Sequence, residues 1–198
     1  CLTVLDRFHP TTWWDDVRAA KATCLHYLGV MPSILMKMPE DARDREHFVR
    51  FGFGAGVDPK LHAPFEARFG FPLCEGWAMT ETGLATAITN NTPDRLIGVS
   101  SLGRPGPEME LRIVTDTGRE AGPDEPGELM VRRSGANPRD GFCSHYYKDK
   151  AATDEAWDGG WFHTGDIVRR DGEGRVFFVD RKKNVIRRSG ENIAAVEV

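Results

Sequence analysis

The pattern of hydrophobic residues changes near residue 95, and this change limits the folds that the chain can adopt. Through residues 1–95, short apolar runs alternate with segments that carry helix start and stop signals. Asp58-Pro59 is one such start, an N-cap residue followed by proline, and Gly70 is the matching stop. Alternation of this kind is typical of a parallel sheet covered by helices, so we predict an α/β subdomain over residues 1–95.

Further elements are predicted within this part of the chain. Thr12 and Asp15 resemble a capping box that opens a helix over about residues 13–23. Met31-Pro32 opens a second, apolar helix, because proline is well tolerated in a first helical turn. The run CLHYLGV predicts a short buried strand, and FVRFGFGAG and FPLCEGW predict two more strands, the first of them ending in a glycine loop.

Residues 96–180 have a different character. MELRIV and GELMVRR alternate apolar and polar residues, as half-buried strands do. The turn DGEG separates DIVRR from RVFFVDR, which predicts a hairpin, and only DKAATDEAW is typical of a helix in this half. We therefore predict an antiparallel, barrel-like β subdomain, followed over residues 181–198 by a basic segment and the opening of another helix.

Composition and charge exclude several classes of partner. The net charge is −4 and no basic block stands out, so we expect no nucleic-acid partner. The apolar runs are much shorter than the ~18 residues that a membrane span needs. The cysteines are widely spaced and form no CxxC pair, which indicates reduced thiols in a cytoplasmic protein rather than a disulfide framework or a zinc site. They are Cys1, Cys24, Cys74 and Cys143.

Two glycine-rich stretches are the first candidates for chemistry. In FGAGVDP, Gly54, Ala55 and Gly56 would let the backbone approach a flat ligand closely. Taken alone, this stretch is better explained as a plain turn from strand to helix that ends in an N-cap, because glycine-rich turns are common. In EGWAMTETG, Trp77 could stack on a base, Thr80 could hold a phosphate oxygen and Glu81 could ligate Mg²⁺. The alternative is that Trp77 is a core aromatic and that the following residues start a solvated helix.

A third candidate is the carboxylate of Asp166, which follows Gly165 at the start of a predicted strand. A carboxylate there can accept both hydroxyls of a ribose. The predicted hairpin would bring Arg181 beside it as a fixed cation for phosphate or ribose. The alternative is an ordinary surface ion pair, which contributes little to stability.

Taken together, these three clusters resemble the adenylate-forming family of acyl-CoA synthetases, luciferases and peptide-synthetase adenylation domains. EGWAMTE is similar to the family's aromatic-Gly-x-Thr-Glu motif, GWFHTGD to its TGD motif, and DRKKNVIRRSGENI to its hinge motif. GEL at 127–129 and HYYKDKAAT match the segment between them. The stretches DREHFVRFGFGAG and FVDRKKNVIRRSGEN resemble the crotonobetaine/carnitine-CoA ligase branch in particular. The fold implied is part of the large N-terminal domain, with residues 181–198 as the hinge and the start of a small C-terminal domain.

The resemblance implies a role for each matching residue. Thr80 and Glu81 would act in catalysis, with Glu81 as the Mg²⁺ ligand, and Trp77 would pack on the adenine where the family usually has Tyr. Asp166 would hold the ribose hydroxyls with help from Arg181, and Lys183 would be the hinge. Ala78 stands where the family usually has Gly. The residues expected to line the adenine, acyl and pantetheine sites are Gly54, Ala55, Gly56, Glu75, Gly76, Trp77, Ala78, Met79 and Gly190.

The activity implied is a two-step ligation of a small carboxylic acid. The acid attacks the α-phosphate of ATP to give an acyl-adenylate and pyrophosphate, and the thiol of coenzyme A then displaces AMP. ATP, AMP, Mg²⁺ and coenzyme A are the expected ligands, and the oligomeric state stays open. The alternatives are an adenylation enzyme that loads a carrier protein, a luciferase-like oxidase, or a nucleotide-binding module without turnover.

The chain begins with Cys1 and stops in GENIAAVEV, so we expect it to be a fragment of a longer chain. The resemblance places the family's phosphate loop before residue 1 and its adenylating lysine beyond Val198. We therefore predict that these 198 residues alone do not exchange radiolabelled pyrophosphate into ATP in the presence of carboxylic acids. Measurable exchange would contradict this prediction.

Overall fold

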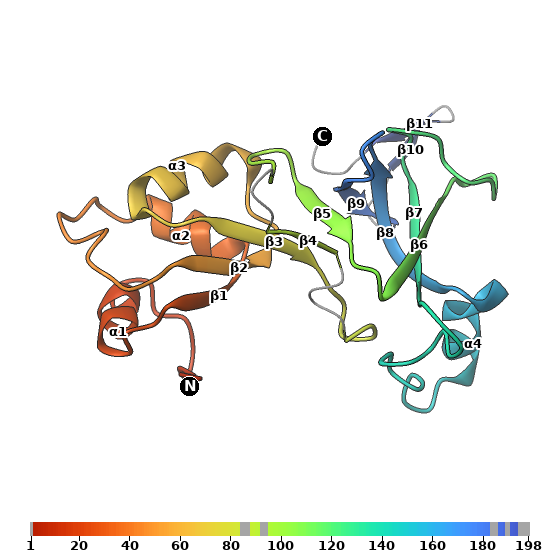
Figure 1. Cartoon of the computed structure of the whole chain (residues 1–198), viewed down its shortest axis with the longest axis horizontal. Coiled ribbons are helices and arrows are strands. Elements are labelled where there is room, and N and C mark those ends of the chain that lie inside the picture. Colours follow the sequence, from red (N-terminus) through yellow and green to blue (C-terminus); the bar gives the residue numbers. More distant parts are fainter. Residues whose placement is uncertain (1, 84–87, 92–94, 183–185, 189–190, 194–198) are drawn as a thin grey trace. The chain divides into compact units, whose positions relative to one another are not determined.

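The computed structural model describes residues 2–83, 88–91, 95–182, 186–188 and 191–193, with side chains up to residue 182 (Figure 1). It divides into two compact units. The first consists of Cys1–Gly76 and Asn91–Ser100, and the second of Trp77–Asn90 and Ser101–Val198. The predicted subdomain boundaries at residues 95 and 180 stay predictions, and the two units are described separately.

The first unit contains six elements around a parallel sheet. In chain order they are α1 (Trp13–Ala19), β1 (Cys24–Leu28), α2 (Val30–Lys37), β2 (Phe51–Ala55), α3 (Pro59–Phe69) and β3 (Leu73–Trp77). β2 lies between β1 and β3 and pairs with both in the parallel direction, which confirms the predicted α/β arrangement. Figure 1 shows α2 and α3 next to each other along this sheet.

Helix α3 begins and ends where the sequence predicts. The Asp58 side chain accepts a hydrogen bond from the Lys60 amide at 2.9 Å, and Pro59 occupies the first turn. Gly70 ends the helix in the left-handed conformation, with φ of 79°, which glycine adopts without strain. These three residues therefore fix the helix that covers the β2–β3 pair.

Helix α1 is shorter than predicted, and its capping box is wrong. Thr12 is the N-cap residue, but its side chain makes no capping bond and instead donates to the Asp16 carboxylate at 3.3 Å. The helix ends at Ala19 rather than near residue 23, and Lys21 then takes a left-handed φ of 49°. The left-handed turn at Lys21 ends the helix early, whereas its start at Trp13 agrees with the prediction.

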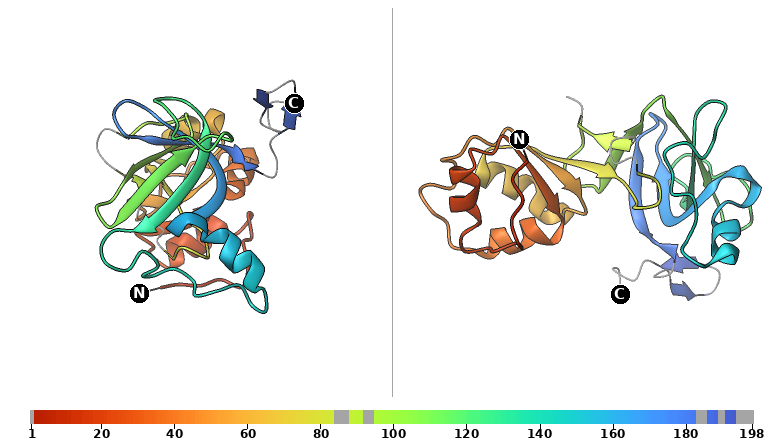
Figure 2. Two further views of the ribbon diagram at one scale, coloured as in Figure 1. Left: turned by 90° about the vertical axis from the view of Figure 1, so that its right-hand side faces the viewer. Right: turned by 90° about the horizontal axis from the view of Figure 1, so that it is seen from below.

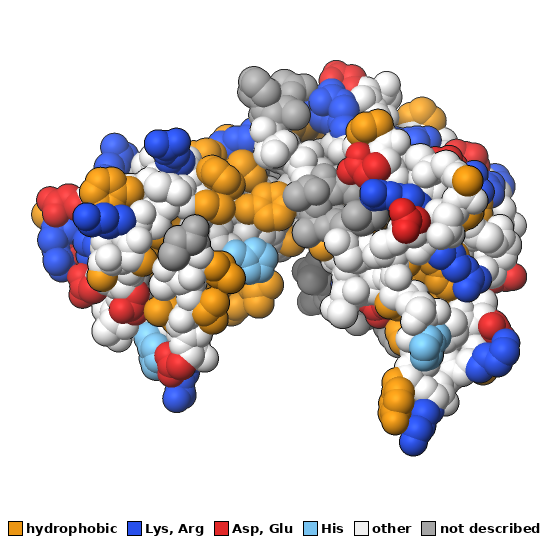
Figure 3. Space-filling view, turned by 60° about the horizontal axis from the view of Figure 1, so that its bottom comes forward, with side chains coloured by type: hydrophobic (Ala, Val, Ile, Leu, Met, Phe, Trp, Pro, Cys, Tyr) orange, Lys and Arg blue, Asp and Glu red, His pale blue; other side chains and the backbone are white. Residues whose placement is uncertain are grey.

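Strand β1 is not the buried strand that CLHYLGV suggested. It lies at one end of the pairing order, so only one neighbouring strand covers it. Tyr27 is its one buried residue, whereas Leu28 is 62% exposed. Figure 3 shows hydrophobic side chains on the surface of this unit, and Val30, Phe48 and Phe51 are among its exposed large residues.

The core of the first unit joins its helices to its sheet. Phe65 and Phe69 of α3 pack with Leu73 of β3, Tyr27 of β1 and Leu35 of α2. Burying a large apolar side chain contributes about 1.5–3 kcal/mol each relative to exposure. All five residues of β3 are buried, so the sequence that leads into EGWAMTETG is held by core packing.

The second unit is built mainly from antiparallel strands, as predicted. They are β4 (Ile88–Asn90), β5 (Ser101–Pro105), β6 (Met109–Val114), β7 (Gly127–Arg133), β8 (Phe162–Arg170) and β9 (Val176–Arg181). Their pairing order is β4-β5-β9-β8-β7-β6, and every pairing is antiparallel. Figure 2 shows helix α4 (Lys150–Ala156) at one end of these strands. Closure into a barrel stays a prediction.

The chain after residue 185 differs from its prediction where the structure describes it. A basic segment was predicted up to residue 190 and a helix after it, most of which lies outside the described residues. Instead β10 (Ile186–Arg188) and β11 (Glu191–Ile193) form an antiparallel pair in which Ile186 lies opposite Ile193. β-Branched residues at paired positions favour such a ladder over a helix.

Gly54 generates a prediction about stability. A Cβ atom at this position would lie 2.1 Å from the Tyr27 carbonyl oxygen, a backbone atom of the paired strand that cannot move aside alone. We expect Gly54→Ala to lower the free energy of unfolding by about 1–3 kcal/mol, as overpacking does. Chemical denaturation followed by circular dichroism measures this change.

The control is Gly172→Ala in the turn between β8 and β9, where an added Cβ meets no atom within 4 Å. We expect a change within about 0.5 kcal/mol, the usual range for surface substitutions. Equal changes in the free energy of unfolding for the two variants would contradict the steric clash expected between an alanine at position 54 and the Tyr27 carbonyl oxygen.

Candidate functional site

A bulge in β8 directs the candidate acid Asp166. The register of β8 on β7 shifts between Glu128 and Met130, and Gly165 adopts a left-handed φ of 68° within the shifted segment. The Thr164 hydroxyl donates to a backbone carbonyl of β7 at 2.6 Å and accepts from the Asp166 amide at 3.0 Å. Bulges often re-aim a side chain. Here the Thr-Gly-Asp sequence produces one, and it turns Asp166 into the interior of the second unit.

The Asp166 carboxylate is bonded to Trp77. The indole Nε1–H of Trp77 donates to Asp166 Oδ2 at 2.8 Å, across 89 positions of sequence. Asp166 is 1% exposed and Trp77 is 4% exposed. Trp77 also belongs to the core of the second unit, as the alternative interpretation expected. Its predicted packing on adenine stays a prediction.

Arg181 lies opposite Asp166, where the predicted hairpin puts it. The two residues are partners in the β8–β9 register, and Arg181 Nε lies 2.7 Å from Asp166 Oδ1. Because the Asp166 side chain is buried, this is not the surface pair of the alternative interpretation. The guanidinium is half-exposed, so it can reach a ligand as well as the acid.

The second carboxylate oxygen of Asp166 lacks a hydrogen bond. Oδ1 is buried and has ion-pair contact with Arg181 but no hydrogen bond within the described residues. Burial raises the pKa of Asp166, and this effect outweighs the lowering by the Trp77 indole and the Arg181 charge. Buried acceptors are usually hydrogen-bonded, so Oδ1 is a candidate acceptor for a ligand donor.

The residues after Trp77 form a turn. Thr80 is exposed, Glu81 is half-buried, and the Thr82 and Gly83 amides both donate to the Met79 carbonyl at 3.2 Å. The described part of this segment is therefore not the solvated helix that the alternative interpretation foresaw. Met79 packs against the core, whereas Ala78 is exposed. Thr80 and Glu81 thus present polar groups from a turn that is anchored on both sides.

Tyr146 contacts Glu81 and was not among the site residues predicted from the sequence. Its hydroxyl donates to Glu81 Oε1 at 3.2 Å, and the Cys143 amide donates to the Glu81 carbonyl at 2.7 Å. Burial, followed by the nearby charge of Glu81, raises the pKa of Tyr146. The only signal in the sequence was its place in HYYKDKAAT, one of the segments that matched the family.

The glycine stretch belongs to the first unit. The close approach of Tyr27 leaves no room for a Cβ atom at Gly54, so glycine is needed at this position whether or not a ligand binds nearby. Ala55 is exposed at the end of β2. Gly56 takes a left-handed φ of 76°, and its nearest contact to an added Cβ is 4.0 Å away. Their predicted role in lining the adenine and acyl site stays a prediction.

Glu75 is buried rather than open to a ligand in the first unit. It is 2% exposed, and its Oε1 accepts a hydrogen bond from the Val57 amide at 3.2 Å. Its side chain therefore fixes the loop that follows β2. Burial raises the pKa of Glu75, and the charge of His62 and the amides of Val57 and Gly56 only partly offset this. Gly76, which follows it, is buried as well.

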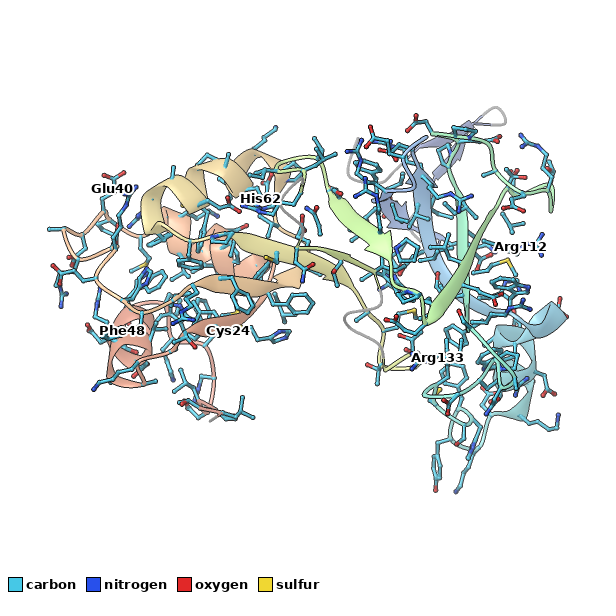
Figure 4. The ribbon with its side chains drawn as sticks, viewed as in Figure 1. Cys24, Glu40, Phe48, His62, Arg112 and Arg133 are labelled. Atoms are coloured by element: carbon cyan, nitrogen blue, oxygen red, sulfur yellow. The ribbon has the colours of Figure 1, made fainter. Side chains whose placement is uncertain are left out.

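Glu66 is a second carboxylate beside His62, and its pKa is lowered whereas that of Glu75 is raised. His62 extends from α3 toward β3 (Figure 4), and its Nε2 lies 3.1 Å from Glu66 Oε1. Arg95 donates to both oxygens of Glu66, at 2.8 and 2.6 Å. Although burial acts to raise it, hydrogen bonds from His62, Arg95 and the Leu73 amide lower the pKa of Glu66 to about 2.

Two predicted site residues, Lys183 and Gly190, lie outside the described residues. The preceding residue, Lys182, is ion-paired with Glu128 at 2.7 Å. Within the described part of the chain, no group of three or more His, Cys, Asp or Glu residues could hold a metal ion. None of the helices there is long and apolar enough to cross a membrane.

Comparison with known proteins identifies the family. The family model described as AMP-binding enzyme matches residues 1–138, which is more than half of the chain. The chain belongs to the AMP-binding enzyme family. The resemblance inferred from the three motif clusters is therefore confirmed.

Relatives within the AMP-binding family are longer than this chain. The crotonobetaine/carnitine-CoA ligase of Salmonella typhimurium strain LT2 is 32% identical over 197 residues, which are 98% of this chain and 37% of that relative. Thus the chain spans little more than a third of the relative that it matches.

Solved structures of AMP-binding enzymes share the fold. A benzoate CoA ligase from Burkholderia xenovorans LB400 matches with a TM-score of 0.81 and 18% identity, over 97% of this chain and 37% of its own. The o-succinylbenzoate CoA synthetase of Bacillus subtilis in complex with an acyl-adenylate matches with a TM-score of 0.76 and 25% identity. The match covers 97% of this chain and 38% of the synthetase. The same synthetase in complex with ATP and magnesium ion matches with a TM-score of 0.73 and 24% identity, over 95% of this chain and 38% of the synthetase.

The opposite pKa shifts of Glu75, which is buried, and Glu66, which is half-buried, generate a prediction for this AMP-binding family chain. Because the folded pKa of Glu75 is raised, its ionisation destabilises the fold as the pH rises through that pKa. Glu75→Gln keeps an oxygen for the Val57 amide and removes the charge. We expect its melting temperature at pH 7.5 to equal or exceed that of the wild type, with the difference shrinking toward pH 4.

Glu66→Gln is the matched control with the opposite sign. Because the folded pKa of Glu66 is lowered, its charge stabilises the fold above its unfolded value and this is lost as the pH falls toward about 2. We expect a lower melting temperature at pH 7.5 and convergence with the wild type in acid. Thermal unfolding between pH 3 and 8 measures both, and parallel pH profiles for the two variants would contradict the assignment.

Proposed function

We propose that this chain supplies the adenine- and ribose-binding part of an ATP-dependent acyl-CoA synthetase. Such an acid–thiol ligase joins a carboxylic acid to coenzyme A in two steps. The acid's oxygen attacks the α-phosphorus of ATP and pyrophosphate leaves, which gives an acyl-adenylate. The thiolate sulfur of coenzyme A then attacks the acyl carbon, and AMP leaves with the electron pair of the broken C–O bond.

The observation that carries this proposal is the buried oxygen of Asp166. Oδ1 has no hydrogen bond within the described residues, and the half-exposed Arg181 guanidinium lies beside it. A ribose hydroxyl supplies the missing donor, because hydroxyls donate to carboxylates at short range. The two residues would hold the sugar while Thr80, exposed on its turn, contacts a phosphate oxygen.

Glu81 fits the proposed Mg²⁺. Mg²⁺ in phosphate sites is commonly held by one or two carboxylates together with substrate oxygens, so a single half-buried glutamate suffices. Tyr146 would orient that carboxylate through its hydroxyl. The metal, when bound, would neutralise phosphate charge. Catalysis by the protein would otherwise consist of positioning and charge stabilisation.

The substrate class rests on the relatives. The Salmonella relative named crotonobetaine/carnitine-CoA ligase supports a carnitine-type acid, at 32% identity. The Bacillus subtilis synthetase that carries ATP and magnesium supports the nucleotide and the metal. We include coenzyme A as the thiol because these relatives are named as CoA ligases, and a cytoplasmic location because the cysteine pattern is that of reduced thiols.

The test uses protein expressed from the complete reading frame that encodes this chain. With ATP, Mg²⁺, coenzyme A and crotonobetaine or carnitine, we expect thioester and AMP to form in equal amounts. Asp166→Asn keeps an oxygen for the Trp77 indole but removes the charge, so we expect kcat/KM for ATP to fall about 10–100-fold, the effect of losing a hydrogen bond to a charged group. Coupled AMP release and mass spectrometry of the thioester measure these outcomes.

The control is Asp171→Asn, which removes a charge from the turn of the same hairpin, where the acid pairs with Arg175 at 2.7 Å. We expect kcat/KM to stay within twofold of the wild type. Adenylate without thioester would favour a carrier-protein-loading enzyme over a CoA ligase. Equal losses in the two variants would remove Asp166 from the nucleotide site.

A further inference from the structure

Glu128 of β7 contacts the bulge of β8, and the proposed function so far gives it no role. Residues 164–166 of β8 stand between the register pairs Glu128–Ile167 and Met130–His163, opposite a single residue of β7. A bulge leaves its extra residue outside the ladder of backbone hydrogen bonds. An amide in that position needs another acceptor, because a buried N–H without one is unfavourable.

The Glu128 carboxylate accepts the amide of Gly165, in the middle of this bulge. Glu128 Oε1 lies 3.3 Å from the Gly165 nitrogen, and the Glu128 side chain is 13% exposed. A hydrogen bond to an ionised carboxylate is stronger than one between neutral groups. Because Gly165 directly precedes Asp166, this bond holds the peptide from which the Asp166 side chain projects.

The second oxygen of Glu128 faces cations. Oε2 lies 2.7 Å from Lys182 Nζ and 3.6 Å from His163 Nδ1. The Lys182 side chain is 56% exposed, so water screens this ion pair and it contributes little. The ion pair therefore balances the charge of Glu128, whereas the contact with Gly165 restrains the backbone.

We propose that Glu128 is a positioning residue for nucleotide binding, acting through the Gly165 amide to hold Asp166 beside Arg181. The inference rests on the proposed function, because it assumes that Asp166 and Arg181 contact the ribose of the nucleotide. The pair is formed across the β8–β9 register, so a shift of the bulge would move the acid away from its arginine.

Two successive residues of β7 hold the bulge in place. The Leu129 carbonyl accepts the Thr164 hydroxyl at 2.6 Å, and the Glu128 carboxylate accepts the Gly165 amide. Gly165 adopts a left-handed φ of 68°, and glycine has the widest conformational range of any residue. Without Glu128, this glycine would be restrained from the Thr164 side alone.

Four substitutions separate the amide contact from the ion pair. Glu128→Ala removes the acceptor, whereas Glu128→Gln keeps an oxygen for the Gly165 amide and removes the charge. Lys182→Ala removes the ion pair by itself. Glu110→Ala is the matched control, because Glu110 lies on the adjacent strand β6 and loses the same carboxylate from a contact with Arg132 at 2.7 Å.

The ligand-free test measures amide hydrogen exchange in the protein expressed from the complete reading frame, using overlapping peptides that isolate Gly165. We expect this amide to exchange about tenfold faster in Glu128→Ala than in the wild type, since loss of its acceptor favours local opening, and within about threefold in Glu128→Gln. Unchanged exchange in Glu128→Ala overturns the inference.

The ligand test compares AMP with 2′,3′-dideoxy-AMP, which lacks both ribose hydroxyls, by isothermal titration calorimetry of the same proteins. We expect the wild type to bind AMP about 10–100-fold more tightly, the contribution of hydrogen bonds to a charged group. In Glu128→Ala this ratio should fall below about threefold, whereas the other three variants should keep it within about twofold of the wild-type value. Partial unfolding lowers the amount of active protein but not the ratio, so the ratio distinguishes positioning from a loss of stability.

The outcomes separate this inference from the proposed function. A wild-type protein that fails to bind AMP, or binds the two nucleotides equally, overturns the proposed function. A wild type that discriminates, together with a Glu128→Ala variant that discriminates as strongly, overturns the inference alone. An equal loss of discrimination in Glu128→Gln or Lys182→Ala also overturns it, because the charge of Glu128 rather than its bond to the Gly165 amide would then be responsible.

Discussion

The buried carboxylate of Asp166 is the point on which the arrangement of the second unit depends. A carboxylate removed from water is unstable unless its oxygens are bonded or paired. Here the indole of Trp77 serves one oxygen, and the guanidinium of Arg181 lies beside the other. These contacts link the end of β3 to the β8–β9 hairpin within the unit. The pKa of Asp166 nevertheless remains raised, which shows that its burial is only partly offset.

In the first unit, burial acts to raise the pKa of two glutamates, but their neighbours give opposite net shifts. Glu66 is surrounded by donors from His62, Arg95 and a backbone amide, and its pKa is lowered to about 2. For Glu75, burial outweighs the charge of His62 and the amide bonds of Val57 and Gly56, and its pKa is raised. The charged form of Glu66 therefore stabilises the unit, whereas the charged form of Glu75 is tolerated because it fixes the loop after β2.

Membership of the AMP-binding family and the local geometry address different questions. The family follows from a match over residues 1–138, and the shared fold follows from the solved CoA ligases and synthetases. Neither says how a particular side chain is used. Trp77 illustrates this, because the motif match predicts that it packs on the adenine, whereas in the structure its indole N–H donates to Asp166, the acid proposed for the ribose. Both contacts can coexist only if the ring face, rather than its N–H, meets the base.

Sequence alone determined the features that local chemistry controls. Asp58, Pro59 and Gly70 set the limits of α3, alternating residues identified β6 and β7, and the turn DGEG put Arg181 opposite Asp166. The motifs also identified the family. Tertiary structure decided what depends on distant neighbours. In the structure β1 lies at one end of the pairing order, α1 ends earlier than predicted, and strand β11 stands at the start of the predicted helix and pairs with β10. It also brought Tyr146 to Glu81 across 65 positions and Trp77 to Asp166 across 89. Periodicity and capping extend over a few residues, whereas a hydrogen bond between buried side chains exists only once the strands that carry them have packed.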